Sequence, residues 1–369
     1  MTVKLMQQVS RFSAIGALLV AGGAHAVSLE AGDFDVSMYG YARLNMAYDL
    51  DANLGDGGTT GAANIGNVNT GDSDVAEGHF NADANQSRLG FSIGHTSGVN
   101  VKIESDFVGG PRLRHAYGTY QGVLAGQTWS NYTSFVGNTS TLDFNSTYGL
   151  AGFQARFTQL RYTTGGLSFS IEDPRTVLAG GLEKKDSMPA VTARYEGKAG
   201  DLSYSVAGLV RQAGYDDGAD DDTVMGYGAF AAARFSLTDR ITIQGAVNYS
   251  DGTTSYLYIA PGPDAFLDSD GDLETVSGYG ATLGMGVKTG SGSFNVGYGM
   301  VSMDLDDAVD AGAVASSQDE TRSTAFVNYQ WNPVENVMYG VELGHFAVDD
   351  QSGDDGDATR ILFAAQYNF

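Results

Sequence analysis

The feature of this sequence that most constrains its fold is an alternation of apolar and polar side chains with a period of two residues. In the closing stretch ILFAAQYNF, one face carries Ile361, Phe363, Ala365, Tyr367 and Phe369. The other face carries Arg360, Ala364, Gln366 and Asn368. Successive side chains of a β-strand point to opposite sides, so this pattern predicts a strand with one apolar and one wetter face.

The same alternation recurs along the chain and predicts about sixteen strands. Most of them are near the 9–11 residues that a tilted strand needs to cross a bilayer. The predicted strands lie at residues 36–50, 80–94, 97–108, 111–120, 122–131, 152–163, 165–172, 187–196, 200–212, 223–235, 240–250, 275–289, 293–303, 321–332, 335–347 and 358–369.

The connections between these strands alternate between short turns, such as HTSG, TTGG and NPVEN, and long acidic loops. The long links lie at 51–79, 213–222, 251–274, 304–320 and 348–357. The sequence therefore predicts an all-β fold, a 16-stranded antiparallel transmembrane β-barrel with short periplasmic turns and long acidic extracellular loops. A soluble β-sandwich is the alternative, although it would not be expected to sort its loops by length.

The N-terminus has the three parts of a secretory signal. Lys4 and Arg11 form a basic region, residues 12–23 an apolar stretch, and Ala24-His25-Ala26 an A-x-A cleavage pattern. A buried N-terminal helix is the alternative. We expect residues 1–26 to be a signal peptide, cleaved after Sec-type export, and residues 27–369 to form one barrel domain in the outer membrane of a Gram-negative bacterium. The mature chain would carry 18 basic and 44 acidic side chains, a net charge of −26.

Ten arginines share the phase of the polar face of their strands. A charge on the lipid side of a barrel costs about 2–4 kcal/mol at the bilayer midplane, so these side chains are expected to face the lumen. Arg161 keeps this phase only if a bulge or slip follows Phe157. The ten are Arg43, Arg88, Arg112, Arg114, Arg156, Arg161, Arg194, Arg211, Arg322 and Arg360.

Two interpretations of these arginines remain open. Fixed guanidinium groups, with Lys102 on the same polar face, would attract anions into a water-filled lumen. Alternatively, the arginines pair with the inward carboxylates Glu104, Asp106, Glu172, Glu196 and Glu342.

Signals for catalysis or for metal binding are poor. The chain has no cysteine, and His79, His95, His115 and His345 are scattered without metal-ligand spacing. We therefore expect no catalytic residue, metal or cofactor, and no nucleic acid partner. The acidic loops either bind divalent cations that bridge to lipopolysaccharide or only keep the loops solvated.

Five stretches together resemble the DcaP-like porins of Gram-negative bacteria: MYGYARLNMAYDLD (38–51), NQSRLGFSI (85–93), LRHAYGTYQGVLAGQTWSNYTSF (113–135), TLDFN (141–145) and QLRYT (159–163). The resemblance implies a sixteen-stranded barrel, a homotrimer and a lumen that favours small anions such as dicarboxylates. It implies that Arg43, Arg88, Arg112, Arg114, Arg156 and Arg161 line the pore. It also implies that residues 130–151 fold inward to narrow it, with Asn131, Tyr132, Asp143 and Asn145 as candidate constriction residues.

The expected function is passive diffusion of small hydrophilic solutes, with a preference for anions such as small carboxylates. The expected partners are lipid and lipopolysaccharide of the outer membrane, and further copies of the chain. One alternative is a plugged or narrow barrel that acts in adhesion or envelope structure. Another is a barrel enzyme, which would need turnover that a histidine substitution abolishes.

Overall fold

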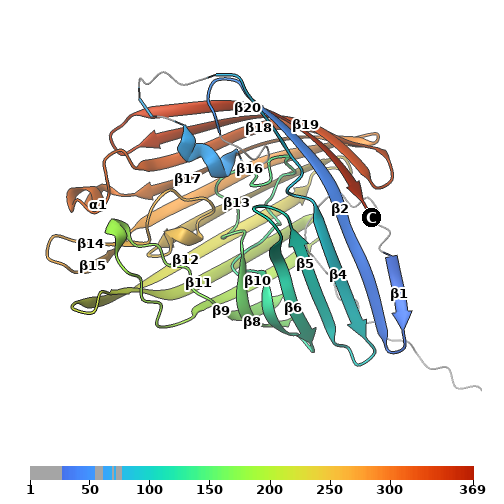
Figure 1. Ribbon diagram of the computed structural model, residues 1–369, viewed down its shortest axis with the longest axis horizontal. Helices are drawn as coiled ribbons and strands as arrows, with labels where there is room; N and C mark the ends of the chain where they lie inside the picture. Colours follow the sequence, from blue (N-terminus) through green and yellow to red (C-terminus); the bar gives the residue numbers. More distant parts are fainter. Residues whose placement is uncertain (1–26, 55–60, 69, 72–76) are drawn as a thin grey trace, which may run out of the picture.

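The structure is a computed structural model that describes residues 27–54, 61–68, 70–71 and 77–369. The expected signal peptide lies outside these residues, as do parts of the expected loop at 51–79. Within the described residues, sixteen antiparallel strands close into a β-barrel (Figure 1). They are β2 (Phe34–Asp49), β3 (His79–Asp83) continued by β4 (Arg88–His95), β5 (Asn100–Asp106), β6 (Arg112–Tyr120), β7 (Val123–Trp129), β8 (Arg156–Thr164), β9 (Leu167–Glu172), β10 (Ala190–Ala199), β11 (Leu202–Asp216), β12 (Asp221–Ser236), β13 (Ile241–Asp251), β16 (Ser277–Thr289), β17 (Gly292–Asp304), β18 (Asp319–Val334), β19 (Val337–Asp350) and β20 (Asp355–Asn368).

The barrel closes where its first and last strands meet. β2 pairs with β20 from Tyr41 opposite Asn368 to Asp49 opposite Arg360. On its other side β2 pairs with β3 and then with β4, which are two halves of the strand expected at 80–94. Closure pairs the backbone groups that an open edge would leave exposed in lipid. The predicted fold class is thereby confirmed.

The outer face of the barrel is apolar and the inner face is polar. Along β17, Phe294, Val296 and Tyr298 are exposed, whereas Asn295 between them is buried. An apolar surface of this extent would be unfavourable in water and is suited to lipid. Other large exposed side chains include Phe91, Leu160, Phe169, Val247, Leu283, Val327 and Val341.

The smaller elements lie mostly in the long connections at one end of the barrel. Figure 1 shows α1 (Asp306–Asp310) and the hairpin of β14 (Ala265–Leu267) and β15 (Leu273–Thr275) on the left, away from β1 (Val27–Ala31). The described residues also contain three short 3₁₀ helices: η1 (Ala62–Asn67), η2 (Ala179–Gly181) and η3 (Thr254–Tyr256). In the part of the chain that is described, no helix has the length and hydropathy of a membrane span.

Two details of register differ from the sequence-based expectation. β8 pairs continuously with β7 and β9, so Arg161 needs no bulge; it shares the inward phase of Gln159. Register shifts occur instead at two places between β18 and β19, and at one place between β5 and β6, where Glu104 pairs with His115 but Ser105 pairs with Leu113. Arg114 is the extra residue of this bulge, so Arg114 and His115 are both buried on the inner side.

Candidate functional site

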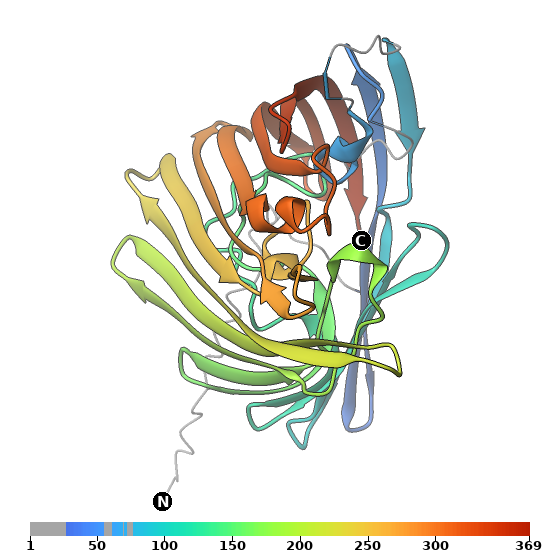
Figure 2. The ribbon, with the colours of Figure 1, turned by 90° about the vertical axis from the view of Figure 1, so that its left-hand side faces the viewer.

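The segment between β7 and β8, residues 130–155, folds into the barrel, and we call it the inward loop. Figure 2 shows green loops crossing the space enclosed by the strands. Glu342 of β19 accepts hydrogen bonds from the backbone N–H groups of Leu142 and Asp143, at 2.7 and 2.9 Å. At the base of the loop, Gly152 N donates to Asn248 Oδ1 of β13 at 2.9 Å. The loop therefore spans the interior and is fixed to strands far from its own ends.

Glycines let the inward loop lie directly on the wall formed by β16 and β17. A Cβ atom on Gly149, whose φ is +67°, would lie 2.4 Å from both the backbone N and O of Ala281. A Cβ on Gly299 would lie 2.2 Å from the carbonyl oxygen of Tyr148. Glycine is required where two backbones approach this closely.

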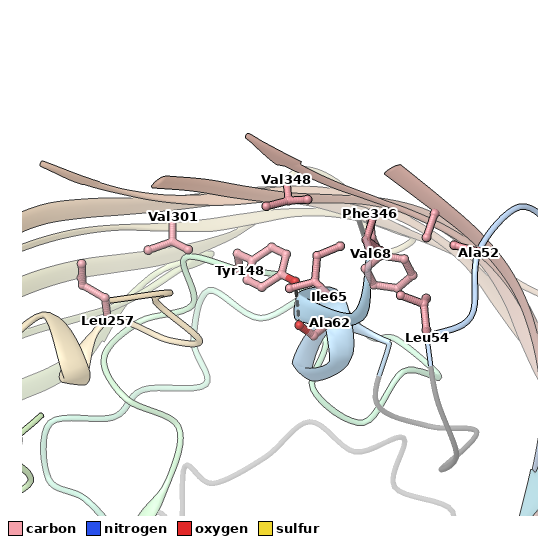
Figure 3. Close-up of a cluster of buried hydrophobic side chains, with 11 residues drawn as sticks. Ala52, Leu54, Ala62, Ile65, Val68, Tyr148, Leu257, Val301, Phe346 and Val348 are labelled. Atoms are coloured by element: carbon pink, nitrogen blue, oxygen red, sulfur yellow. Dashed lines mark hydrogen bonds between the residues drawn. The ribbon is translucent and has the colours of Figure 1, made fainter. Parts of the chain in front are cut away.

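A hydrophobic cluster fills the interior on the side of β17 to β20. η1 packs beneath Phe346 and Val348 of β19, and Tyr148 of the inward loop donates a hydrogen bond to the carbonyl oxygen of Ala62 at 2.6 Å (Figure 3). The inner face expected to be wetted by water is therefore packed against folded loops on this side, because those loops supply Ile65 and Tyr148 to cover it. Most of the cations without a carboxylate of their own lie on another part of the wall, from β4 to β8.

Four cations surround two carboxylates on the inner face of β4, β5 and β6, and we call this group the basic wall. Arg114 donates to Glu104 and to Asp106, each at 2.8 Å, and all three side chains are almost fully buried. Arg112 forms a bidentate pair with Asp106: its Nε and Nη2 donate to the two carboxylate oxygens at 2.9 and 2.7 Å. Arg88 and Lys102 lie 3.8 and 3.9 Å from Glu104. The expected pairing of arginines with Glu104 and Asp106 occurs, yet the cations outnumber the carboxylates.

The tip of the inward loop touches the basic wall. The Arg88 guanidinium lies 5.0 Å from the centre of the Phe144 ring, and that of Arg114 lies 5.7 Å from it. Arg43 is buried beside this contact, and its Nη2 donates to the carbonyl oxygen of Leu142 at 2.8 Å. Arg43 thus holds the loop tip, while Arg88 remains partly open to the lumen.

Further cations line the stretch between the basic wall and the base of the loop. The Arg156 guanidinium stacks over Trp129 at 4.5 Å. Among the described residues, Arg156 and Arg161 have no carboxylate within 4 Å, and both side chains are partly exposed. Arg194 and Arg234 donate to backbone carbonyl oxygens of the loop, at Thr133 and Asn138.

The four expected constriction residues fix the inward loop to its surroundings. Asn131 N donates to Glu172 Oε1 at 2.6 Å, and Tyr132 packs 5.1 Å from Phe230. Asn145 Nδ2 donates to the Tyr258 hydroxyl at 3.2 Å. All but Asn145 are buried, so they lie away from open water in the lumen.

Asp143 is the titratable group of the loop tip. Its Oδ1 accepts from Asn145 N at 2.8 Å and its Oδ2 from Ala62 N at 3.3 Å. Burial raises the pKa of Asp143 to about 6, and these N–H groups only partly oppose that rise.

Four of the ten expected arginines lie in ion pairs outside the basic wall. Arg194 of β10 lies 3.8 Å from Glu196, one of its expected partners, and three more pair with aspartates. Arg211 of β11 lies 2.7 Å from Asp264, Arg322 of β18 lies 2.6 Å from Asp319, and Arg360 of β20 donates to Asp49 at 2.8 Å. Asp264 lies in the loop between β13 and β16, and burial raises its pKa despite Arg211. For these four, pairing with carboxylates is the observed arrangement.

The sequence did not identify Trp129, Phe144 or Arg234 as neighbours of the lumen. Trp129 and Phe144 lie at the edge of a strand and in a loop, where the period-two pattern carries no information about direction. Arg234 had the necessary signal, because it alternates with the exposed Phe235 on β12. In the described part of the chain, no group of three or more His, Cys, Asp or Glu could hold a metal ion.

Comparisons with known proteins agree with this architecture. The family model of the DcaP outer membrane protein matches residues 24–369. The crystal structure of the outer membrane channel DcaP of Acinetobacter baumannii is similar, with a TM-score of 0.78 and 27% identity, over 93% of this chain and 100% of that chain. A search of the curated proteins finds no match.

Two more distant structures share the fold. The anion-selective porin from Comamonas acidovorans has a TM-score of 0.58 and 11% identity, over 91% of this chain and 100% of its own. Outer-membrane expressed OmpT of Vibrio cholerae has a TM-score of 0.58 and 10% identity, over 93% and 100%. At such identities the likeness concerns the barrel alone.

Proposed function

Because the chain belongs to the DcaP outer membrane protein family and is an outer-membrane porin channel, we propose that its lumen favours small anions, carboxylates and dicarboxylates above all. The observation that carries this proposal is the excess of cations over carboxylates along β4 to β8. Four cations surround Glu104 and Asp106, and Arg156 and Arg161 add two charges that have no carboxylate within 4 Å among the described residues.

The physical basis is the dielectric environment of the pore. Fixed guanidinium groups beside low-dielectric walls focus the electric field and raise the local concentration of anions. A planar guanidinium also forms bidentate hydrogen bonds with a carboxylate. Solutes would diffuse down their concentration gradient, without bond chemistry, and the channel family favours a role that is not enzymatic.

The test is the reversal potential in planar bilayers under a potassium chloride gradient. We expect Arg156→Gln combined with Arg161→Gln to lower the ratio of chloride to potassium permeability. The matched control is Arg240→Gln, which removes the same charge from an exposed position in the turn before β13. An unchanged ratio in the double variant would show that Arg156 and Arg161 do not produce the anion preference, and a wild-type ratio of one or less would overturn the preference itself; neither result would affect the barrel fold.

A second candidate is a closed barrel that serves in adhesion or in envelope structure. The observation in its favour is the interior cluster of η1, Tyr148 and Phe346, which fills the lumen beside β17 to β20. Single-channel recording separates the two candidates, because a closed barrel would show no conductance steps of about nanosiemens size.

We also propose that the chain forms homotrimers and contacts lipid and lipopolysaccharide of the outer membrane. The support is family membership and the apolar outer face.

The acidic loops are proposed to act as solvated turns, since Asp268 Oδ1 accepts hydrogen bonds from two backbone N–H groups of its own loop, Asp270 N and Asp272 N, both at 2.9 Å. Mass measurement in detergent would check the trimer, and calcium titration would check for cation bridging.

A further inference from the structure

A cavity of about 440 Å³ lies at the loop end of the barrel, and we call it the mouth pocket. Four separate segments form it: Phe153 of the inward loop, residues 175–180 after β9, residues 255–263 after β13, and residues 313–318 after α1. None of the cations of the basic wall lines it. Its size lies in the range of ordinary small-molecule sites.

The lining of the mouth pocket is partly apolar and partly polar, and it carries one positive charge; Ser255 and Gln318 are among its polar residues. Arg175 is the one charged side chain among the described residues that line it. Its guanidinium stacks 5.0 Å from the centre of the Phe153 ring, and no carboxylate of the described chain lies within 4 Å. The backbone of Arg175 is held in place, because its N–H donates to the Tyr256 hydroxyl at 3.0 Å. The apolar part comprises Val177, Leu178, Leu257, Ile259, Ala260, Pro261, Pro263 and Val314.

The backbone beside the pocket is strained at two places. Ile259, a lining residue, has a φ of +60°, which is sterically costly for a β-branched side chain. Gln154, next to Phe153, has a φ of +54° and is held by hydrogen bonds from its Nε2 to Ser134 O at 2.8 Å and Ala151 O at 2.9 Å. Such strain persists where the surroundings enforce it and gathers at ligand-binding positions.

We propose that the mouth pocket binds anions that carry a carboxylate on a compact apolar body, before they enter the lumen. The carboxylate would pair with the Arg175 guanidinium, which Phe153 orients by stacking. The apolar body would leave water against Leu257, Ile259 and Val314. This inference rests on the proposed function, since it assigns a solute class to the entrance of the same channel.

The experiment is isothermal titration calorimetry on the folded mature chain in detergent, with a blank titration into micelles. Cyclohexanecarboxylate is the probe, and acetate, which lacks the apolar body, is the comparator. We expect the probe to bind at least about tenfold more tightly than acetate. We expect Arg175→Gln to weaken binding of the probe by about tenfold or more.

The matched control is Lys184→Gln, which removes one charge from the same long connection outside the pocket, where Lys184 lies 2.9 Å from Asp186. Equal affinity of the wild type and Arg175→Gln would overturn the inference, as would equal affinity for acetate or no heat from the probe. If the bilayer recordings show an anion preference but calorimetry detects no binding of the probe, the mouth-pocket inference is wrong and the proposed function stands. If calorimetry detects binding of the probe but the bilayer recordings show no anion preference, the proposed function is wrong and the mouth-pocket inference stands.

Discussion

Glu342 on β19 binds the backbone N–H of Leu142 at 2.7 Å, across 200 residues of sequence. The same carboxylate binds the N–H of Asp143, so one buried side chain satisfies two donors at the tip of the inward loop. Hydrogen bonds to a charged group contribute about 1.5–3 kcal/mol each. The position of the loop, and with it the open cross-section beside the basic wall, therefore depends on Glu342.

The substitution Glu342→Gln is expected to loosen the inward loop. It keeps the shape of the side chain but replaces one acceptor by an NH₂ group, which leaves a buried N–H donor unpaired at a cost of about 1–3 kcal/mol. Single-channel recordings should show larger current fluctuations in the open state. The control is Glu274→Gln, which alters an exposed carboxylate of β15 and should behave as the wild type. Identical current noise in the two variants would contradict the assigned contact.

The stability of the docked loop should depend on pH through Asp143. Burial raises the pKa of this carboxyl to about 6 from its ordinary 3.8. A raised carboxyl pKa means that the docked state holds its proton more firmly than the released state does. Docking is therefore strongest below about pH 4 and weakens as pH rises through 6, by about 3 kcal/mol at most.

The measurement for this prediction is protease cleavage of the inward loop in the folded barrel at pH 5 and pH 7.5. Cleavage should be slower at pH 5 after correction for the activity of the protease. Asp143→Asn, which cannot ionise, should abolish the difference that is due to this group. A pH effect of the same size in that variant would assign it to other groups, such as the adjacent Glu342.

Gly149→Ala should destabilise the protein more than a glycine substitution without a close contact. Its Cβ would overlap backbone atoms of Ala281 at 2.4 Å, and its φ of +67° is unfavourable for alanine. Gly353→Ala is the matched control, because φ is also positive there, +87°, but nothing lies within 4 Å of the added Cβ. In both variants the positive φ should lower the free energy of unfolding by about 1 kcal/mol, and in Gly149→Ala the backbone overlap should lower it further. Urea midpoints of the refolded barrels measure the difference, and equal midpoints would count against the close approach.

Deletion of Phe369 should weaken the seam of the barrel. Gly40 N donates to Phe369 O at 3.1 Å, and Phe369 N donates to Gly40 O at 3.0 Å, so the last residue closes the ladder between β2 and β20. The deletion should reduce the fraction that survives as a compact band in warm SDS. Phe369→Leu keeps both backbone bonds and should retain more of that band; equal loss would place the effect in the aromatic ring.

The alternation of side chains predicted the barrel well because it is a local property. β2, β6 and β20 lie close to the expected ranges, and the outward direction of Phe363 and Tyr367 follows from their neighbours in sequence. Local pattern was less informative at Arg114, where a bulge turns two successive side chains inward. It was silent about η1, whose apolar residues lie inside a long connection without a strand period.

The sequence by itself determined the closed antiparallel sheet, the lipid-facing side of each strand and the inward direction of most arginines, because a charge is costly against lipid at every such position. Only the tertiary structure decided which of these cations keep a free charge. Arg211 and Arg360 are neutralised by Asp264 and Asp49, whereas Arg156 stacks on Trp129. Ion pairing depends on distances of a few ångströms between residues far apart in the chain, and strand periodicity carries no information about those distances.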